Sequence, residues 1–190
     1  MTFSEYKNRN NLLNLDFLKS EAKSVHAFGL GFIQLKLSEH HRLHFYCPEV
    51  TLTVGEEDVH DHRYGFKSEV IKGSLENSLF VLDFSQNTHL LREESCNPNR
   101  PVENKDNIIC GLNELGQFTT LAGSTYSLSK DTLHRVETKR AITFLTREVP
   151  TKDAARVVIK ANGPVICPFS VNLNEEELWR LIAREIHNAY

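Results

Sequence analysis

The residues of this chain best suited to carry out chemistry are three histidines. His60 and His62 are two residues apart in a segment with strand-like patterning. Alternate side chains of a β-strand point to the same face, so both imidazoles can project into one cavity. His134 lies near the start of a later predicted strand. Three neutral imidazoles from two strands would leave coordination positions for water, oxygen or substrate, so the sequence predicts a three-histidine metal site.

The spacing around these histidines resembles that of the cupin superfamily. The first cupin motif is commonly H-x-H, a short spacer, Glu, six residues and Gly; this chain has Phe66 at the Glu position and Gly73 at the Gly position. The second motif ends on a histidine that corresponds to His134, with Ser129 and Asp131 where the family usually has Pro and Gly. The resemblance implies a cupin barrel whose metal site lacks the usual glutamate ligand.

The three-histidine variant and the local sequence are similar to cysteine dioxygenase, a thiol dioxygenase. Glu69, three residues after Phe66, should face away from the site by strand alternation, so it is a poor substitute for the missing ligand. The matching stretches are the H-D-H motif, the G-S-L turn that leads to L-F, and the run L-H-R-V-E around the third histidine. The resemblance implies that the histidines bind ferrous iron, which holds a thiolate and dioxygen side by side so that oxygen is added to sulfur.

The chain departs from that family beside the metal site. Animal cysteine dioxygenases have a cysteine, crosslinked to a tyrosine, at the position of Phe66. The strand after the third histidine bears Ser, His and Tyr at alternate positions in the family, whereas the corresponding residues here are Thr143, Leu145 and Arg147. The loss of the His and the Tyr would remove the usual polar network beside the oxygen site. The substrate is therefore expected to be a small thiol or another small polar molecule.

Several further side chains are candidates for substrate binding. A substrate carboxylate needs a cation, and the candidates are Lys36, Arg42 and Arg147, of which only the arginines offer a bidentate guanidinium. Tyr64 could donate a hydrogen bond into the site, and Phe66 should border it. The alternative for each cation is an ordinary surface charge, and the alternative for Tyr64 is aromatic packing.

Three functions are compatible with this site. The first is a non-haem iron dioxygenase, an oxidoreductase with Fe²⁺ as cofactor and with a small molecule and O2 as its partners. The second is an isomerase or hydrolase that uses Zn²⁺, Mn²⁺ or Ni²⁺ as a Lewis acid. The third is a non-catalytic metal-binding or sensor module, because a fold does not determine its function. Oxygen consumption with Fe²⁺ would distinguish the first from the second.

The composition favours a cytoplasmic protein that binds neither nucleic acid nor a membrane. A net charge of −3 and a pI near 6.3 give no electrostatic attraction for polyanions. No apolar run approaches the roughly 20 residues that span a bilayer, and the charged N-terminus is unlike a signal peptide. The four cysteines lack the spacing of a metal or redox motif; Cys47, Cys110 and Cys167 are expected in the core and Cys96 at the surface. A homodimer is compatible with the sequence.

The elements that must position the histidines are short strands. Runs with strand-like patterning, separated by Gly, Pro and charged residues, follow one another at a spacing typical of a sandwich or barrel. We therefore predict a mainly β fold, a single cupin barrel (double-stranded β-helix, jelly-roll-like) over about residues 28–170. The predicted strands are 32–37, 42–47, 51–54, 67–71, 78–83, 116–122, 125–128, 141–147 and 156–160.

Helices are predicted at both ends of one domain, 1–190. A helical appendage over about residues 1–25 has a capping-box pattern at Thr2 and Glu5. A C-terminal helix over about residues 174–188 begins with a similar pattern at Asn174 and Glu177, followed by an apolar stripe at helical spacing.

The segment 85–107 interrupts the strand pattern. It is polar and contains two prolines, so it is predicted to be a long loop. Loops of this length are usually functional or disordered, and the sequence leaves open whether this one is a lid over the site or a disordered surface segment.

Overall fold

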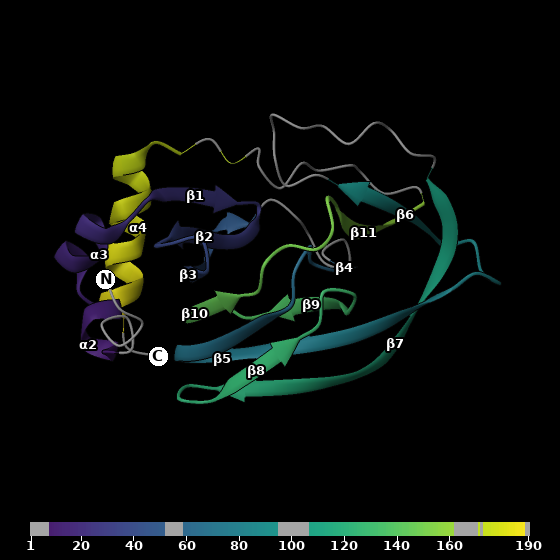
Figure 1. Ribbon diagram of the computed structural model, residues 1–190, viewed down its shortest axis with the longest axis horizontal. Coiled ribbons are helices and arrows are strands. Elements are labelled where there is room, and N and C mark those ends of the chain that lie inside the picture. Colours follow the sequence, from purple (N-terminus) through teal and green to yellow (C-terminus); the bar gives the residue numbers. More distant parts are fainter. Residues whose placement is uncertain (1–7, 52–58, 95–106, 162–170, 172, 189–190) are drawn as a thin grey trace.

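The computed structural model describes residues 8–51, 59–94, 107–161, 171 and 173–188 of the 190-residue chain. Within these ranges an 11-stranded sheet is accompanied by a few helices (Figure 1). The helices are α2 (Arg9–Leu12), α3 (Leu15–Glu21) and α4 (Glu175–His187). The strands are β1 (Ser24–Phe28), β2 (Leu30–Lys36), β3 (His41–Thr51), β4 (Val59–His60), β5 (Phe66–Asp83), β6 (His89–Glu94), β7 (Ile108–Leu121), β8 (Thr125–Leu128), β9 (Leu133–Glu137), β10 (Ala141–Arg147) and β11 (Ala155–Lys160).

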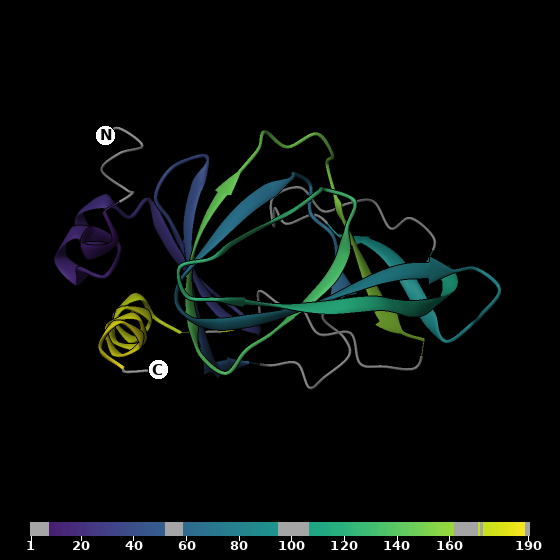
Figure 2. The same ribbon diagram turned by 90° about the horizontal axis from the view of Figure 1, so that it is seen from below.

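The long strand β5 joins two parts of the antiparallel sheet. Its first half pairs with β10 and β8, and its second half pairs with β7 and β9. From β5 the pairings continue through β7, β6, β11, β4 and β9 and return to β5, so these six strands close a barrel. On the other side of β5, strands β10, β3, β2 and β1 extend the sheet. Figure 2 shows the helices gathered at one end of the strands.

Strand β5 changes its partners at Gly73. Gly73 pairs with Ala141 of β10, whereas the next residue, Ser74, pairs with Leu121 of β7. The φ of Gly73 is 78°, in the left-handed region that side chains disfavour. A Cβ at this position would approach a backbone carbonyl oxygen of the turn before β10 to 2.5 Å. A glycine is therefore required for one continuous strand to pass through this bend.

The part of the sheet that contains β3 has one apolar and one polar face. Leu43 and Phe45 are fully buried in the main core, which includes residues of α3 and α4. The alternate residues Arg42, His44 and Tyr46 lie on the opposite face, because side chains alternate along a strand. This alternation places polar side chains of β3 on the side of the sheet where Tyr64 and His62 lie.

Helix α4 is fixed at its start and along one face. The Asn174 side chain accepts a hydrogen bond from the backbone N–H of Glu177 at 2.9 Å, and the Glu177 carboxylate accepts one from Asn174 N–H at 2.9 Å. This is the capping box that the sequence predicts. Leu178 and Ile182, part of the predicted apolar stripe, are buried in the main core. The helix therefore covers the apolar face of the sheet.

The predicted fold class is confirmed. The chain is mainly β, with helices near both ends, and its antiparallel barrel is consistent with a cupin-like fold. The predicted strands 125–128 and 141–147 coincide with β8 and β10. The predicted strands 67–71 and 78–83 are corrected to the single strand β5, because Gly73 bends this strand without ending it.

Other boundaries also differ from those predicted. Strand β6 lies within the segment 85–107 that was expected to be a loop, β7 begins at Ile108, and β1 was not predicted. Residues 95–106, the pattern at Thr2 and Glu5, and most of the predicted strand 51–54 lie outside the described residues. In the part of the chain that the structure describes, no helix has the length and apolarity needed to cross a membrane.

Candidate metal centre

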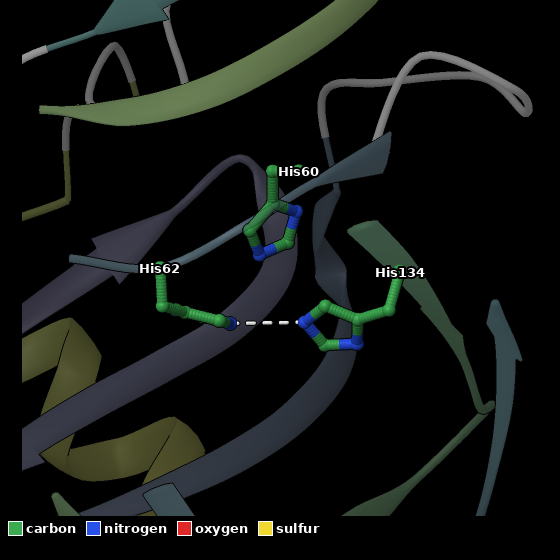
Figure 3. Close-up of side chains that lie close together, drawn as sticks. All are labelled: His60, His62 and His134. Atoms are coloured by element: carbon green, nitrogen blue, oxygen red, sulfur yellow. Dashed lines mark hydrogen bonds between the residues drawn. The ribbon is translucent and has the colours of Figure 1, made fainter. Parts of the chain in front are cut away.

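The three histidines come from two neighbouring strands of the barrel. His60 of β4 pairs directly with His134 of β9, and paired residues of antiparallel strands point to the same side. His62 follows two residues after His60, just beyond the end of β4, where its N–H donates to the carbonyl oxygen of Lys130 at 3.3 Å. Figure 3 shows the three rings directed toward one another.

The rings lie close enough for their nitrogens to share one ion. The ring centroids are 5.0 Å apart for His60 and His62, 5.0 Å for His60 and His134, and 5.1 Å for His62 and His134. The Nε2 atoms of His62 and His134 are 2.9 Å apart (Figure 3). One ligand atom from each histidine lies within 4.8 Å of the others. Because imidazole nitrogens bind first-row metals at about 2.0–2.1 Å, nitrogens at such separations can face a common ion.

Burial and neighbouring rings keep two of these imidazoles, those of His62 and His134, neutral. Burial lowers the pKa of His62 well below its usual 6.5, and the nearby His60 and His134 lower it further. Burial, followed by the effect of His60, also lowers the pKa of His134. A neutral imidazole is the form that binds a metal ion, so at neutral pH these two rings are ready to act as ligands.

The ligand set contains no carboxylate. Among the residues that the structure describes, the group of mutually close ligand atoms around this point consists of histidine nitrogens. Phe66 occupies the expected glutamate position, with its ring centroid 4.8 Å from that of His62 and 6.2 Å from that of His134. Glu69 pairs with Phe144 on β10, a residue of the main core, so it lies on the other face of β5 as predicted.

The His134 ring is held differently from most metal-binding imidazoles. Its Nδ1 atom is buried and forms no hydrogen bond with any described residue. Metal-binding histidines usually donate this second N–H to an acceptor. Here the ring is fixed by packing, since His134 is 2% exposed and contacts Phe66. By contrast, His60 and His62 keep part of their surface accessible to water.

Four of the five predicted substrate-binding residues form a cluster beside His62. Arg42 Nη1 donates to the Tyr64 hydroxyl at 2.9 Å, and the guanidinium carbons of Arg42 and Arg147 lie 5.5 Å and 5.0 Å from the centroid of the Tyr64 ring. The Tyr64 ring centroid is 5.8 Å from that of His62. Phe66 contacts the histidines directly and pairs with Arg147 across β5 and β10.

The two arginines differ in how their charges are balanced. Arg147 donates through Nε to the backbone carbonyl of Glu39 and pairs through Nη2 with the exposed Glu39 carboxylate at 3.3 Å. Arg42 also donates to Gln34 Oε1 at 3.0 Å, but it has no carboxylate partner in the part of the chain that is described, and its Nε is buried without a hydrogen bond. Arg42 is therefore a partly buried cation beside the histidines whose charge is not neutralised by an ion pair.

Lys36, the fifth predicted residue, lies farther from the histidines. Its ammonium group pairs with the Glu39 carboxylate at 2.6 Å, and Glu39 in turn contacts Arg147. Lys36 is thus in the outer part of this charged cluster, next to solvent.

His44 on strand β3 brings a further polar group close to His62. It pairs with Thr143 of β10 and interacts electrostatically with His62. Burial, together with Arg42, lowers the pKa of His44 to about 3, so its ring is neutral. The exchanges on β10 stand as predicted, but β3 supplies other polar groups in their place, His44 and Arg42, opposite Thr143 and Leu145.

Three further polar residues of the interior were missed by the sequence analysis. Ser68 and Asn77 of β5 are 1% and 0% exposed, and Tyr126 of β8 pairs with Ser68. Burial raises the pKa of Tyr126 to about 12, against an opposing effect of Ser68 and Asn77. Each of these residues lies two positions from an apolar residue of the same strand and so shares its face. That spacing could have identified them as inward-facing, but polar side chains are ordinarily assigned to the solvent face.

A surface groove lies on the outer side of Phe66. Its volume is about 670 Å³, and its lining includes Phe66, Leu128 and Arg147. Phe66 lines this groove, and its ring also lies beside those of His62 and His134.

Comparisons with known proteins leave this site without a close relative. No protein-family model matches the sequence, and no curated protein gives a significant match. Among solved structures, the chain is similar to the crystal structure of hydroquinone 1,2-dioxygenase from Sphingomonas sp. TTNP3 with 4-hydroxybenzoate bound, at 13% identity and a TM-score of 0.29, over 85% of this chain and 86% of that one. A likeness this weak carries no argument about function, which depends on the residues of this chain.

Proposed function

We propose that this chain is a metal-dependent dioxygenase of the cupin type, in which His60, His62 and His134 hold Fe²⁺. Its substrate would be a small thiol or another small polar molecule with an anionic group. The observation that carries the proposal is a group of close histidine nitrogens that contains no carboxylate. Neutral ligands leave the charge of a divalent ion uncompensated, which favours an anionic donor atom on the substrate.

The iron, when bound, would supply neighbouring coordination positions for the donor atom of the substrate and for dioxygen. For a thiol the overall reaction balances without an external reductant: R–S⁻ + O2 gives R–SO2⁻, with both oxygen atoms on sulfur. Sulfur is oxidised and dioxygen is reduced in the same reaction. The protein must therefore bind the substrate, orient its sulfur and exclude competing water.

Arg42 is the residue best suited to bind an anionic group of the substrate. Its guanidinium lacks a carboxylate partner within the described chain, and its Nη1 is oriented by Tyr64 and Gln34. Arg147 lies on the Tyr64 ring and adds a second positive charge. Two guanidinium groups beside the histidines favour a substrate with a carboxylate, because charge-assisted hydrogen bonds are the strongest that a side chain can offer.

Phe66 would control access to the histidines. The residue lines the surface groove and its ring lies beside the His62 and His134 rings, so a substrate that enters from the groove would pass Phe66 on its way to the histidines. An apolar ring at this position also keeps water away from the metal, which strengthens electrostatic interactions inside the site.

The proposal is tested by metal analysis of the purified chain, followed by oxygen-uptake measurements with Fe²⁺. The substrates are cysteine, 3-mercaptopropionate and cysteamine, and the product is identified as a sulfinate by mass spectrometry. We expect oxygen uptake with the two carboxylated thiols and less with cysteamine, which has no carboxylate for Arg42. Metal binding without oxygen uptake in a wider substrate panel would instead favour a Lewis-acid enzyme or a non-catalytic metal-binding module.

A further inference from the structure

Asp61 lies between His60 and His62 in the sequence, and its side chain points to the opposite face from the two imidazoles. It is 1% exposed and accepts three hydrogen bonds. The donors to its carboxylate are the Arg156 backbone N–H at 2.7 Å, Arg156 Nε at 2.6 Å and Lys152 Nζ at 2.8 Å. A buried carboxylate with two cations in contact is fixed in position, since any movement would break charge-assisted hydrogen bonds.

Both cations also bind the segment that leads to the third histidine. Lys152 Nζ donates to the carbonyl oxygen of Lys130 at 3.0 Å and contacts the Asp131 carboxylate at 3.0 Å. Arg156 Nη2 donates to the carbonyl oxygen of Asp131 at 3.0 Å. Each of the two side chains therefore connects Asp61 to residues 130–131, just before His134.

Few backbone contacts fix the distance between the same two segments. Strands β4 and β9 pair at one position, His60 with His134. His62 lies beyond the end of β4, and its backbone bond to Lys130 is long, at 3.3 Å. The side-chain contacts of Asp61 thus provide much of what holds the two ligand-bearing segments together.

We infer that Asp61, Lys152 and Arg156 form a clamp that positions His60 and His62 relative to His134 and so sets the metal affinity of the site. These are positioning residues, because they act on the ligands through Asp61 and through the backbone at residues 130–131. The inference rests on the proposed function only in that it requires the three histidines to bind a metal ion. It requires neither catalysis nor a particular substrate.

The chain contains a matched control for this clamp. Glu185 is also a fully buried carboxylate bound by two cations, Arg140 and Arg184. It lies on α4, near Cys47 of the sheet against which this helix packs. Replacing Glu185 removes a buried charge from a similar network and leaves the histidines untouched. A general loss of stability would therefore affect both variants, whereas a positioning effect is expected only for Asp61.

The test compares the full-length wild type, Asp61→Asn, Lys152→Met and Glu185→Gln, each freed of metal and titrated with Zn²⁺ and with Co²⁺. We expect Asp61→Asn and Lys152→Met to weaken both affinities by about 10- to 100-fold, the usual effect of losing a residue that orients metal ligands. The Co²⁺ absorption spectrum should change in both. Glu185→Gln should keep the wild-type affinity and spectrum despite a lower melting temperature, and Lys152→Arg should restore part of the affinity.

Two results would overturn the inference, and they have different meanings. Wild-type affinity in a folded Asp61→Asn or Lys152→Met variant would reject the clamp and leave the metal site intact. A wild-type chain that binds neither ion would reject the metal site together with the clamp. If Asp61→Asn does not fold, Lys152→Met still tests the clamp, because it leaves the Asp61 contacts with Arg156 in place.

Discussion

Two regions of the molecule bring three potential metal-binding side chains together, and they differ in what surrounds them. His60, His62 and His134 form one group, and Cys47, Glu49 and Glu185 form the other; in each group the ligand atoms lie within 4.8 Å of one another. By distance alone, both are candidate metal sites. Their charges and protonation states separate them.

The second group is already satisfied by protein cations. Arg140 pairs with Glu185 and, at 2.9 Å, with Glu49. Arg184 pairs with Glu49 at 2.8 Å and with Glu185 at 3.2 Å. Burial, Glu185 and Glu49 raise the pKa of the Cys47 thiol to about 12, so at neutral pH it is not the thiolate that metals bind. This group fastens α4 to the sheet.

In the histidine group, by contrast, the protonation states favour metal binding. Burial lowers the pKa of His62 and of His134, which leaves them in the form that binds a metal ion. Arg42, which donates a hydrogen bond to Tyr64 and lowers the pKa of His62, has no carboxylate partner among the described residues. The difference shows that proximity of ligand atoms is insufficient, and that the protonation state and the absence of competing ion pairs identify the candidate site.

The largest effect is expected from His134→Ala. Loss of one of three ligands should abolish stoichiometric metal binding, because two imidazoles cannot hold the ion against water and buffer. The measurement is metal content after reconstitution and desalting. Cys47→Ala, in the other group, serves as the control and should keep the full metal content. Retention of metal by His134→Ala would contradict the assignment of the metal site to the histidines, and loss of metal in Cys47→Ala would assign it to the other group.

Glu185→Gln should produce the largest change in stability. Removing one partner of a buried ion-pair network leaves charges uncompensated and typically costs 3–5 kcal/mol; because Arg140 and Arg184 are partly exposed, we expect about 3 kcal/mol. Urea unfolding of the metal-free chain measures the loss. Wild-type stability in this variant would indicate that the network does not fasten α4.

How far the sequence predicted these features depends on the range of the contacts involved. The common direction of His60 and His62 and the position of Glu69 on the opposite face from Phe66 follow from strand alternation, which is local. The pairs formed by Asp61 with Lys152 and Arg156 join residues more than 90 positions apart, and nothing in the local pattern indicates them. They could be found only once the barrel had brought the segments together.

The strand errors have similar causes. Gly73 normally indicates a turn, but its left-handed backbone serves here to bend β5 while the strand changes partners. Strand β6 escaped prediction because Leu91 is its one buried residue, so its sequence resembles a polar loop. In both places, long-range pairing overrides the local preference.

Arg42→Met tests the cation that lacks an ion pair. For a carboxylated substrate such as 3-mercaptopropionate we expect KM to rise about 10- to 100-fold, since a hydrogen bond to a charged group contributes roughly 1.5–3 kcal/mol. Lys36→Met is the control, because Lys36 already pairs with the exposed Glu39. The same increase of KM for cysteamine, which has no carboxylate, would show that Arg42 acts on something other than the anionic group.

The smallest effect is expected on the pH dependence of stability, and it comes from His44. Burial keeps this imidazole neutral, as it keeps the Cys47 thiol neutral in the other region. Burial lowers the pKa of His44 in the folded chain to about 3, whereas an unfolded histidine titrates near 6.5. As the pH falls through 6.5, the unfolded chain takes up a proton that folded His44 does not, so the wild type loses stability. Between pH 7 and pH 5.5 this loss in the free energy of unfolding amounts to about 1 kcal/mol.

His44→Gln should remove that part of the pH dependence, while the other histidines contribute equally to both proteins. Unfolding free energies of the two metal-free chains that decrease in parallel with pH would mean that His44 is protonated in the fold, and the distinction between the two regions would then rest on His62 and His134 alone.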